Sequence, residues 1–97
     1  MTDKALCDYL KKYHRGQESA ASSKELEAAF SVKGVELRRA INRLRCSGYP
    51  ICSDATGYFY AARQSEIRAT VAQLTGRISK IAAATKGLLK SYEETEG

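Results

Sequence analysis

The chain has 97 residues and a mass of 10.7 kDa, enough for one small domain and one appendage. Hydrophobic residues make up 43% and charged residues 28%, as in ordinary folded proteins, and this usage excludes global disorder. No apolar run approaches the roughly 18 residues that a membrane span needs. The first fifteen residues are interrupted by charges, unlike a secretory signal peptide. We therefore expect a cytoplasmic protein with no membrane partner.

The net charge points to a polyanionic partner. Sixteen Lys and Arg oppose eleven Asp and Glu, which gives a net charge of +5 at pH 7. Residues 1–64 hold eleven of the basic and seven of the acidic residues, so most of the excess lies in the first two-thirds of the chain. A basic excess concentrated in one region is what a nucleic-acid-binding domain shows.

The cysteines and the single histidine give little support for a metal centre or a catalytic pair. Cys7, Cys46 and Cys52 are odd in number and form no CxxC pair, so we expect three reduced thiols. His14 does not stand at zinc-finger spacing from any of them. Because so short a chain also has little room for a buried pocket, the sequence predicts no enzyme activity, no cofactor, no metal and no small-molecule ligand.

The first stretch of helical periodicity follows Thr2, which can cap a helix, and ends before Gly16. Its apolar stripe consists of Leu6, Cys7, Leu10 and Tyr13. Residues 17–21 form a polar connection with room for a very short strand. Ser22 and Glu25 then fit a capping box at the start of a second, short helix. The apolar side of that helix is predicted to be Leu26, Ala29 and Phe30.

A third helix is predicted over residues 34–46, with Gly48 as its left-handed C-terminal cap. Its inward face is Leu37, Ala40, Ile41 and Leu44. Two short strands follow, at 50–53 and 58–61, joined by a turn that contains Asp54 and Gly57. The predicted fold class is mainly α with a small β-hairpin, in the element order of a winged helix-turn-helix, followed by a long C-terminal helix.

Residues 22–60 resemble the winged helix-turn-helix of bacterial and phage regulators, of the type found in the N-terminal domain of the biotin repressor. The most specific part is the string LRCSGYPICSDATGYFY, in which Gly-Tyr-Pro-Ile leads into a wing that closes with Gly-Tyr. Small winged-helix proteins of Gram-positive prophages are also similar and have a helical tail after the wing. The resemblance implies binding of double-stranded DNA through the second helix of the motif. It implies no biotin-ligase activity, because that domain is not among the 97 residues.

Helical projection at 100° per residue places a basic face opposite the core stripe of the third helix. Arg side chains can bind guanine or a phosphate, and Asn can pair with adenine. The first turn of such a helix reaches base edges, and Gly34 permits a close approach. A phosphate could also meet the start of the second helix. The predicted DNA-binding residues are Ser22, Ser23, Lys24, Lys33, Gly34, Val35, Arg38, Arg39, Asn42, Arg43 and Arg63.

The wing is predicted to support the fold more than to bind DNA. Its tip, residues 54–57, has no Lys or Arg, whereas a wing that enters the minor groove normally offers a cation. Tyr58, Phe59 and Tyr60 alternate in direction, and we expect packing under the hairpin to occupy some of them. Arg63, just past the hairpin, is therefore the better phosphate candidate. Glu36 departs from the pattern, because a carboxylate in the first turn repels phosphate.

Apolar residues after position 65 recur at alternating steps of four and three over nearly four heptads. Ile67, Leu74, Ile81 and Leu88 fall at d positions, and Val71, Ile78, Thr85 and Tyr92 at a positions. We expect Ser65 to cap this helix and its first turns, at Ile67 and Val71, to pack on the domain, against the first helix. A helix of about 40 Å is longer than so small a domain can cover. The residues predicted to form an oligomer, with a dimer favoured, are Val71, Leu74, Ile78, Ile81, Thr85, Leu88 and Tyr92.

The sequence thus predicts a winged helix-turn-helix domain at 1–63, an oligomerisation helix at 64–92 and a frayed acidic tail at 93–97. The expected function is sequence-specific DNA binding by a dimeric transcriptional regulator of phage or prophage type. Two alternatives stay open: a protein-docking module built on the winged helix, and a replication or packaging accessory. The operator, the oligomer size and the parallel or antiparallel pairing of the helices are also open.

Overall fold

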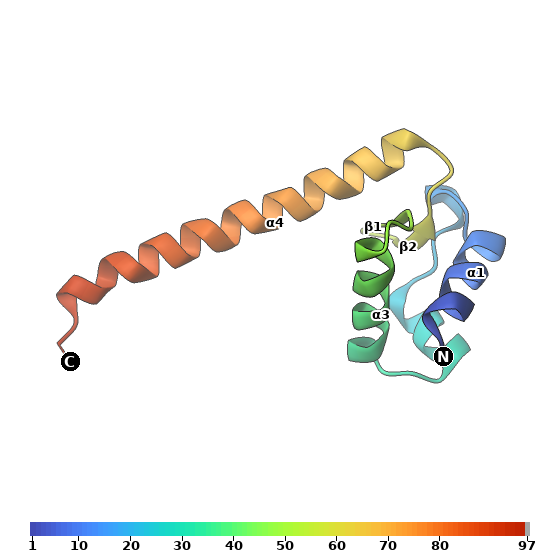
Figure 1. The fold of residues 1–97 in the computed structure, drawn as a ribbon, viewed down its shortest axis with the longest axis horizontal. Helices are drawn as coiled ribbons and strands as arrows, with labels where there is room; N and C mark the ends of the chain where they lie inside the picture. The colour runs from blue at the N-terminus through green and yellow to red at the C-terminus, as the bar shows by residue number, and fades with distance from the viewer. Residues whose placement is uncertain (97) are drawn as a thin grey trace.

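A computed structural model describes residues 1–96, which form a small N-terminal domain and one long projecting helix (Figure 1). In chain order the elements are α1 (Asp3–Tyr13), a 3-10 turn (Gln17–Ser19), α2 (Ser23–Phe30), α3 (Gly34–Cys46), β1 (Ile51–Asp54), β2 (Gly57–Tyr60), α4 (Gln64–Ser91) and a 3-10 turn (Tyr92–Glu94). The mainly helical class with one hairpin and a long C-terminal helix is confirmed. Of the predicted tail, Gly97 lies outside the described residues.

The core lies where the three helices of the N-terminal domain meet the hairpin. Its largest fully buried side chains are Leu6, Leu10, Leu26, Leu37 and Cys52. All four residues predicted to face inward on α3 are buried. Two inward predictions are wrong. Tyr13 is 57% exposed because α1 ends there and the ring packs on Tyr9 at the surface, and Ala29 is exposed because α2 reaches the core through Leu26 and Phe30.

The predicted caps at Thr2 and Ser22 are present, but of the reciprocal capping box predicted for Ser22 and Glu25 only the bond to the Ser22 hydroxyl forms among the described residues. The Thr2 hydroxyl accepts a hydrogen bond from the Ala5 N–H at 3.0 Å, and the Ser22 hydroxyl accepts one from the Glu25 N–H at 3.1 Å. At the end of α3, Gly48 has φ +93°, and its N–H bonds the Arg45 carbonyl while the Tyr49 N–H bonds the Leu44 carbonyl. This is the Schellman arrangement, which stops α3 and turns the chain toward β1.

Besides the pairing of β1 with β2, strand β2 forms two single-residue bridges, at Tyr60 with Arg15 and at Tyr58 with Ala21. Tyr58 and Ala21 exchange two backbone hydrogen bonds of 2.8 Å, at the site where a very short strand was predicted. A side chain at Gly57 would collide with the carbonyl of Ala21, and Gly57 has φ +140°, so only glycine fits there. Both strands lie one residue away from their predicted bounds, because Asp54 pairs directly with Gly57.

The start of α4 is fixed to the domain by polar contacts that differ from the prediction. The helix begins at Gln64 after Arg63, so Ser65 is not its cap. Instead, Glu66 accepts hydrogen bonds from the backbone N–H groups of Ala62 and Gln17, each at 2.8 Å. Thr70 is only 6% exposed and bonds the backbone of Ser53 in β1. The packed unit therefore extends several residues past the predicted boundary at 63.

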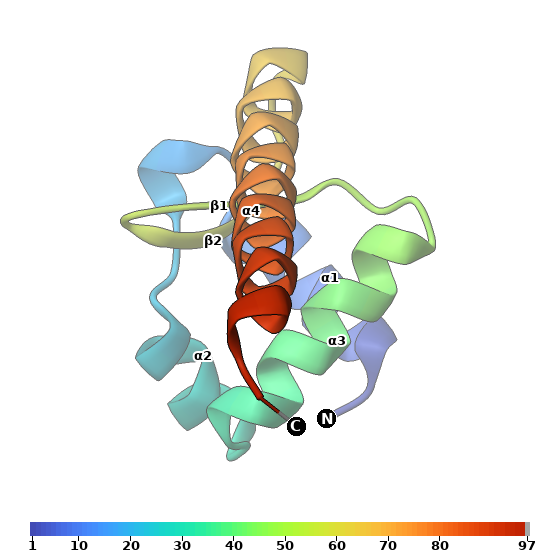
Figure 2. The same ribbon diagram turned by 90° about the vertical axis from the view of Figure 1, so that its left-hand side faces the viewer.

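The first turns of α4 pack on the hairpin and not on α1, so the predicted contact of Ile67 and Val71 with the first helix is wrong. Thr70 takes the buried position because it faces β1, which leaves Ile67 and Val71 partly exposed. Beyond this junction, α4 projects away from the domain on the side where α3 lies, opposite α1 (Figures 1 and 2). No helix among the described residues is long and apolar enough to cross a membrane.

Candidate nucleic-acid interface

The candidate interface is the outer face of α3, which the buried stripe of that helix holds in a fixed orientation. Because the inward residues are packed against α1 and α2, the opposite side must point to solvent. Val35, Glu36, Arg38, Arg39 and Asn42 are all exposed. The structure therefore places the residues of α3 that were predicted to contact bases on one exposed face. The Glu36 carboxylate lies in the N-terminal turn of this face.

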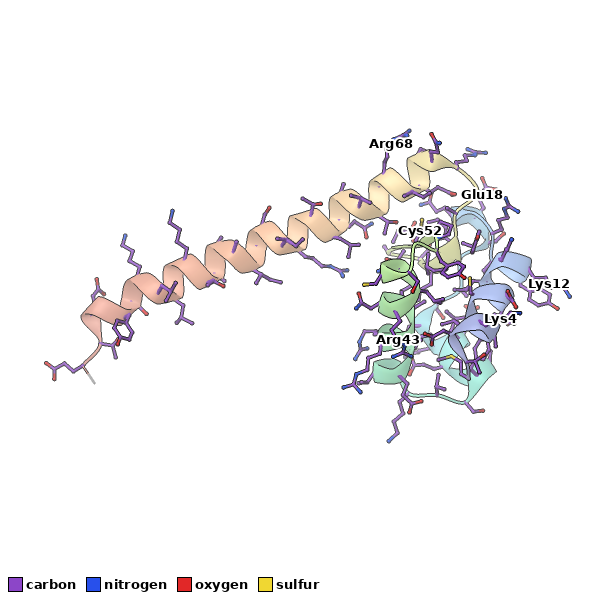
Figure 3. All side chains as sticks on the ribbon, in the orientation of Figure 1. Lys4, Lys12, Glu18, Arg43, Cys52 and Arg68 are labelled. Carbon is purple, nitrogen blue, oxygen red and sulfur yellow. The ribbon has the colours of Figure 1, made fainter. Side chains whose placement is uncertain are left out.

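Arg43 lies at the edge of this face and is held by α1. Arg43 is labelled on α3 in Figure 3. Its Nε and Nη2 atoms donate to the two carboxylate oxygens of Asp3 at 2.9 and 3.0 Å, a bidentate ion pair between α3 and α1. The hydrogen bond from Arg43 lowers the pKa of the Asp3 carboxyl below its usual value and raises that of the guanidinium. One of the predicted DNA-contacting arginines thus already has a carboxylate partner.

Arg45 is used inside the protein and is not part of the interface. Its Nε donates to the Ile51 carbonyl at 2.7 Å, and its Nη2 donates to the Ser53 hydroxyl at 2.9 Å. Burial lowers the pKa of the Arg45 guanidinium. These bonds connect the C-terminal turn of α3 to β1, so they fix the angle between that helix and the hairpin.

The residues predicted to contact DNA at the starts of α2 and α3 differ in whether they are hydrogen-bonded within the protein or exposed to solvent. Ser22 uses its hydroxyl to cap α2, and the Ser23 hydroxyl donates to the Glu27 carboxylate at 2.9 Å. Lys24 and Lys33 are exposed, and Lys33 is the residue that precedes α3. A side chain at Gly34 would lie 3.2 Å from the Arg38 guanidinium, so this glycine leaves room for that arginine.

An open groove beside the hairpin adds two cations that the sequence did not single out. It runs between the start of α2, the hairpin tip and one face of α4, and its lining includes Ser22, Ser23, Thr56, Gln73, Arg77 and Lys80. Arg77 and Lys80 lie on the same face of α4 because they are three positions apart along the helix. The heptad pattern of α4 predicts a role only for its apolar residues. The spacing of Arg77 and Lys80, three positions apart, is the sequence feature that indicates a basic face on this helix.

Arg63 stands apart from the rest of the predicted site. It is exposed and lines a small cleft with Arg15, Glu18 and Glu66, at the junction of β2 and α4. That cleft shares no residue with the groove beside the hairpin or with the outer face of α3. The structure therefore does not bring Arg63 together with the α3 residues.

Residues 1–96 contain no cluster of three or more His, Cys, Asp or Glu side chains that could hold a metal ion. All three cysteines are free, and burial raises the pKa of the Cys7 and Cys52 thiols, which disfavours the reactive thiolate. Comparison of the chain with protein-family models, curated proteins and solved structures gave no match.

Proposed function

We propose that the protein is a winged helix-turn-helix DNA-binding protein that reads double-stranded DNA through α3. The observation that carries the proposal is the outer face of α3, where Arg38, Arg39 and Asn42 are exposed. Among the described residues, these three side chains make none of the hydrogen bonds or ion pairs that hold the fold together. Two arginines and one asparagine on an exposed helix offer the donors and acceptors that base edges in the major groove require.

The polar residues of the candidate interface divide into two roles. Arg39 and Asn42 are central on the face and contact bases, while Arg38, Lys33 and Lys24 contact phosphates. Because α4 projects from the side of the domain where α3 lies, a duplex bound to α3 runs close to α4 (Figure 1). Arg77 and Lys80 then supply phosphate contacts that the hairpin tip, with no Lys or Arg, does not supply.

Selection of bound sequences from random duplex DNA, followed by affinity measurements on the selected site, tests the proposal. Arg39→Ala and Asn42→Ala should each weaken binding to that site by about 1–3 kcal/mol and relax selection at particular base pairs. Arg77→Ala and Lys80→Ala should weaken binding to all sequences equally and reduce its salt dependence. Unchanged binding by the Arg39→Ala/Asn42→Ala double variant at constant stability contradicts the assignment.

We further propose that the protein acts as a dimer and regulates transcription in a phage or prophage setting. The apolar residues along α4 support dimer formation, since they are exposed beyond the first turns. A two-fold dimer matches a pseudo-palindromic site and gains effective concentration from its two domains. A selected sequence that is a sharp palindrome supports a regulator, whereas binding without sequence preference supports a replication or packaging accessory.

A protein-docking module is the second candidate function. It is favoured by one feature, the hairpin tip at residues 54–57, whose only charged side chain is the Asp54 carboxylate. Phosphates repel a carboxylate at this position. A docking module predicts little affinity for any duplex at low salt, which is the measurement that separates it from the DNA-binding function.

A further inference from the structure

The apolar stripe of α4 is exposed along almost its whole length. Ile78, Ile81 and Leu88 are 66%, 65% and 75% exposed, and Tyr92 is 80% exposed. Thr85, in the same stripe, donates its hydroxyl to the Ile81 carbonyl at 2.9 Å, so that it can be buried without leaving its hydroxyl group unpaired. These side chains form a surface that another apolar helix can cover.

At its base, this stripe joins a groove that the N-terminal domain helps to form. Ile67, Val71 and Leu74 line one side of the groove, and Tyr49 and Pro50 of the loop between α3 and β1 line the other. Tyr49 is half exposed. At the other end of α4, Leu89 is exposed beside Leu88 and widens the apolar surface there as well.

We propose that α4 pairs with α4 of a second copy of the chain in antiparallel orientation, and that the C-terminal turns of each α4 enter the groove beside Tyr49 and Pro50 of the other. This inference rests on the proposed function only in that it specifies the geometry of the proposed dimer. It assigns Leu88, Leu89 and Tyr92 to a contact with the partner's N-terminal domain, in addition to the helix-to-helix contact.

The position of Thr70 selects the antiparallel orientation. Thr70 is buried against β1 and lies three residues after Ile67 and four before Leu74, so the domain is next to the base of the stripe. In a parallel pair of α4 helices, the N-terminal turns of the two copies lie side by side. The two N-terminal domains then lie at the same end of the pair, where they overlap. An antiparallel partner brings only its C-terminal turns, and the two domains stand at opposite ends.

The spacing of the stripe is self-complementary in one antiparallel register. When Ile78 stands opposite the partner's Ile81, every other a residue also stands opposite a d residue. The resulting layers are Ile67 with Tyr92, Val71 with Leu88, Leu74 with Thr85 and Ile78 with Ile81. The small Thr85 then meets Leu74, whereas a parallel pair aligned in register sets two threonines against each other in the middle of an apolar seam.

Charge and area agree with this pairing. Residues 67–92 contain five Lys or Arg and no acidic residue, and the acidic residues of the helix end follow at 93, 94 and 96. Antiparallel pairing sets that acidic end beside Arg63, Glu66 and Arg68 of the partner, and the Glu66 carboxylate already accepts hydrogen bonds from backbone N–H groups. Parallel pairing instead sets the two acidic ends together. Most of the eight stripe residues are more than half exposed, so burying them in both copies removes on the order of 1,000 Å² or more from water, comparable to the roughly 1,200–2,000 Å² of stable protein interfaces.

Disulfide cross-linking in the absence of DNA tests the inference. Two full-length chains of different mass tag, one with Val71→Cys and one with Leu88→Cys, are prepared with Cys46→Ser, since Cys46 is the exposed native thiol and the other two are buried. Mild oxidation of the mixture should give the disulfide between Val71→Cys and Leu88→Cys as the main product, because the pair stands in one layer. Either chain alone should give no more linked dimer than Ala83→Cys, which lies on the exposed opposite face.

Each other outcome overturns the inference. Self-linking of the Val71→Cys chain indicates parallel helices, and linking at the Ala83→Cys level in every sample indicates that no such pair forms. Tyr49→Ala should also lower the yield of the mixed disulfide if the partner's C-terminal turns occupy the groove, and an unchanged yield removes the groove from the contact. Because no DNA is present, loss of DNA binding by the α3 variants leaves these results unaffected.

Discussion

Helices α3 and α4 have similar apolar spacing but different surroundings. In α3 the stripe residues Leu37, Ala40, Ile41 and Leu44 are all nearly inaccessible to solvent, because α1, α2 and β1 cover them. In α4 the corresponding stripe is covered only near Thr70, and the rest projects into solvent (Figure 1). The apolar pattern of a helix thus predicts that one of its faces will be buried. Whether that face is buried within its own chain or against a partner depends on which elements of the chain lie next to it.

The largest effect that distinguishes the two helices is expected from truncating one leucine in each. Leu37→Ala removes a fully buried side chain of α3 and should lower the free energy of unfolding by about 2–5 kcal/mol. Leu88→Ala, the matched change in the exposed stripe, should leave the stability of the N-terminal domain unchanged and weaken only self-association. Chemical denaturation at low protein concentration measures the free energy of unfolding of the two variants, and light scattering at higher concentration measures their self-association. Equal destabilisation by the two variants would mean that α4 is folded onto its own domain.

A charge placed in the middle of the α4 stripe should separate the copies without unfolding them. Ile78→Glu sets an unpaired carboxylate into a seam that pairing removes from water, which is strongly unfavourable. We expect a monomer by light scattering, with the circular dichroism of the N-terminal domain retained and binding to a full palindrome greatly weakened. Ser79→Glu, on the exposed opposite face, is the control and should remain a dimer. A wild-type protein that is monomeric at tens of micromolar contradicts the dimer.

The smallest effect concerns the junction between the two regions. Hydrogen bonds from the backbone N–H groups of Gln17, Ala62 and Arg63 hold the pKa of the Glu66 carboxyl below its ordinary value. A carboxyl whose pKa is lowered by folding stabilises the fold above its unfolded pKa, and this contribution is lost as the pH falls through the folded value. Glu66→Gln should therefore lower stability at neutral pH by about 1–2 kcal/mol, as loss of a helix cap does.

The difference between Glu66→Gln and the wild type should begin to narrow as the pH falls below the ordinary pKa of a glutamate carboxyl, and should be lost once the pH passes below the lowered pKa of folded Glu66. Thermal unfolding across pH 2–7 measures this convergence. Glu94→Gln, an exposed carboxylate near the chain end, serves as the control and should change stability little at any pH. A constant difference between Glu66→Gln and the wild type over the whole range shows that the carboxylate charge is not what matters.

The helices and the hairpin could be predicted from the sequence because their signals are local. Capping residues at Thr2 and Ser22, the four inward residues of α3 and the glycine at 48 act within a few residues of their own helix. The exposed basic face of α3 followed from the same periodicity. These features require no knowledge of how the elements meet.

The contacts between distant segments could not be predicted in this way. Asp3 is 40 residues from Arg43, and Glu66 is 49 residues from Gln17. No periodic pattern links such pairs, and an acidic residue in the first turn of a helix is expected on dipole grounds alone. The exposure of Tyr13, the contact of α4 with the hairpin and the groove that holds Arg77 and Lys80 all depend on the angles at which the elements pack, which spacing along one helix does not determine.

The length of α4 has a consequence for the DNA that the proposed dimer can read. A helix of 28 residues is about 42 Å long. In an antiparallel pair, this length sets how far apart the two N-terminal domains stand. Helix-turn-helix dimers bind half-sites about 34–36 Å apart, one turn of the double helix. The length of the paired helices therefore sets the distance between the two half-sites that the dimer can bind. Inserting one heptad into α4 should change the preferred spacing of the half-sites without changing the bases read within each.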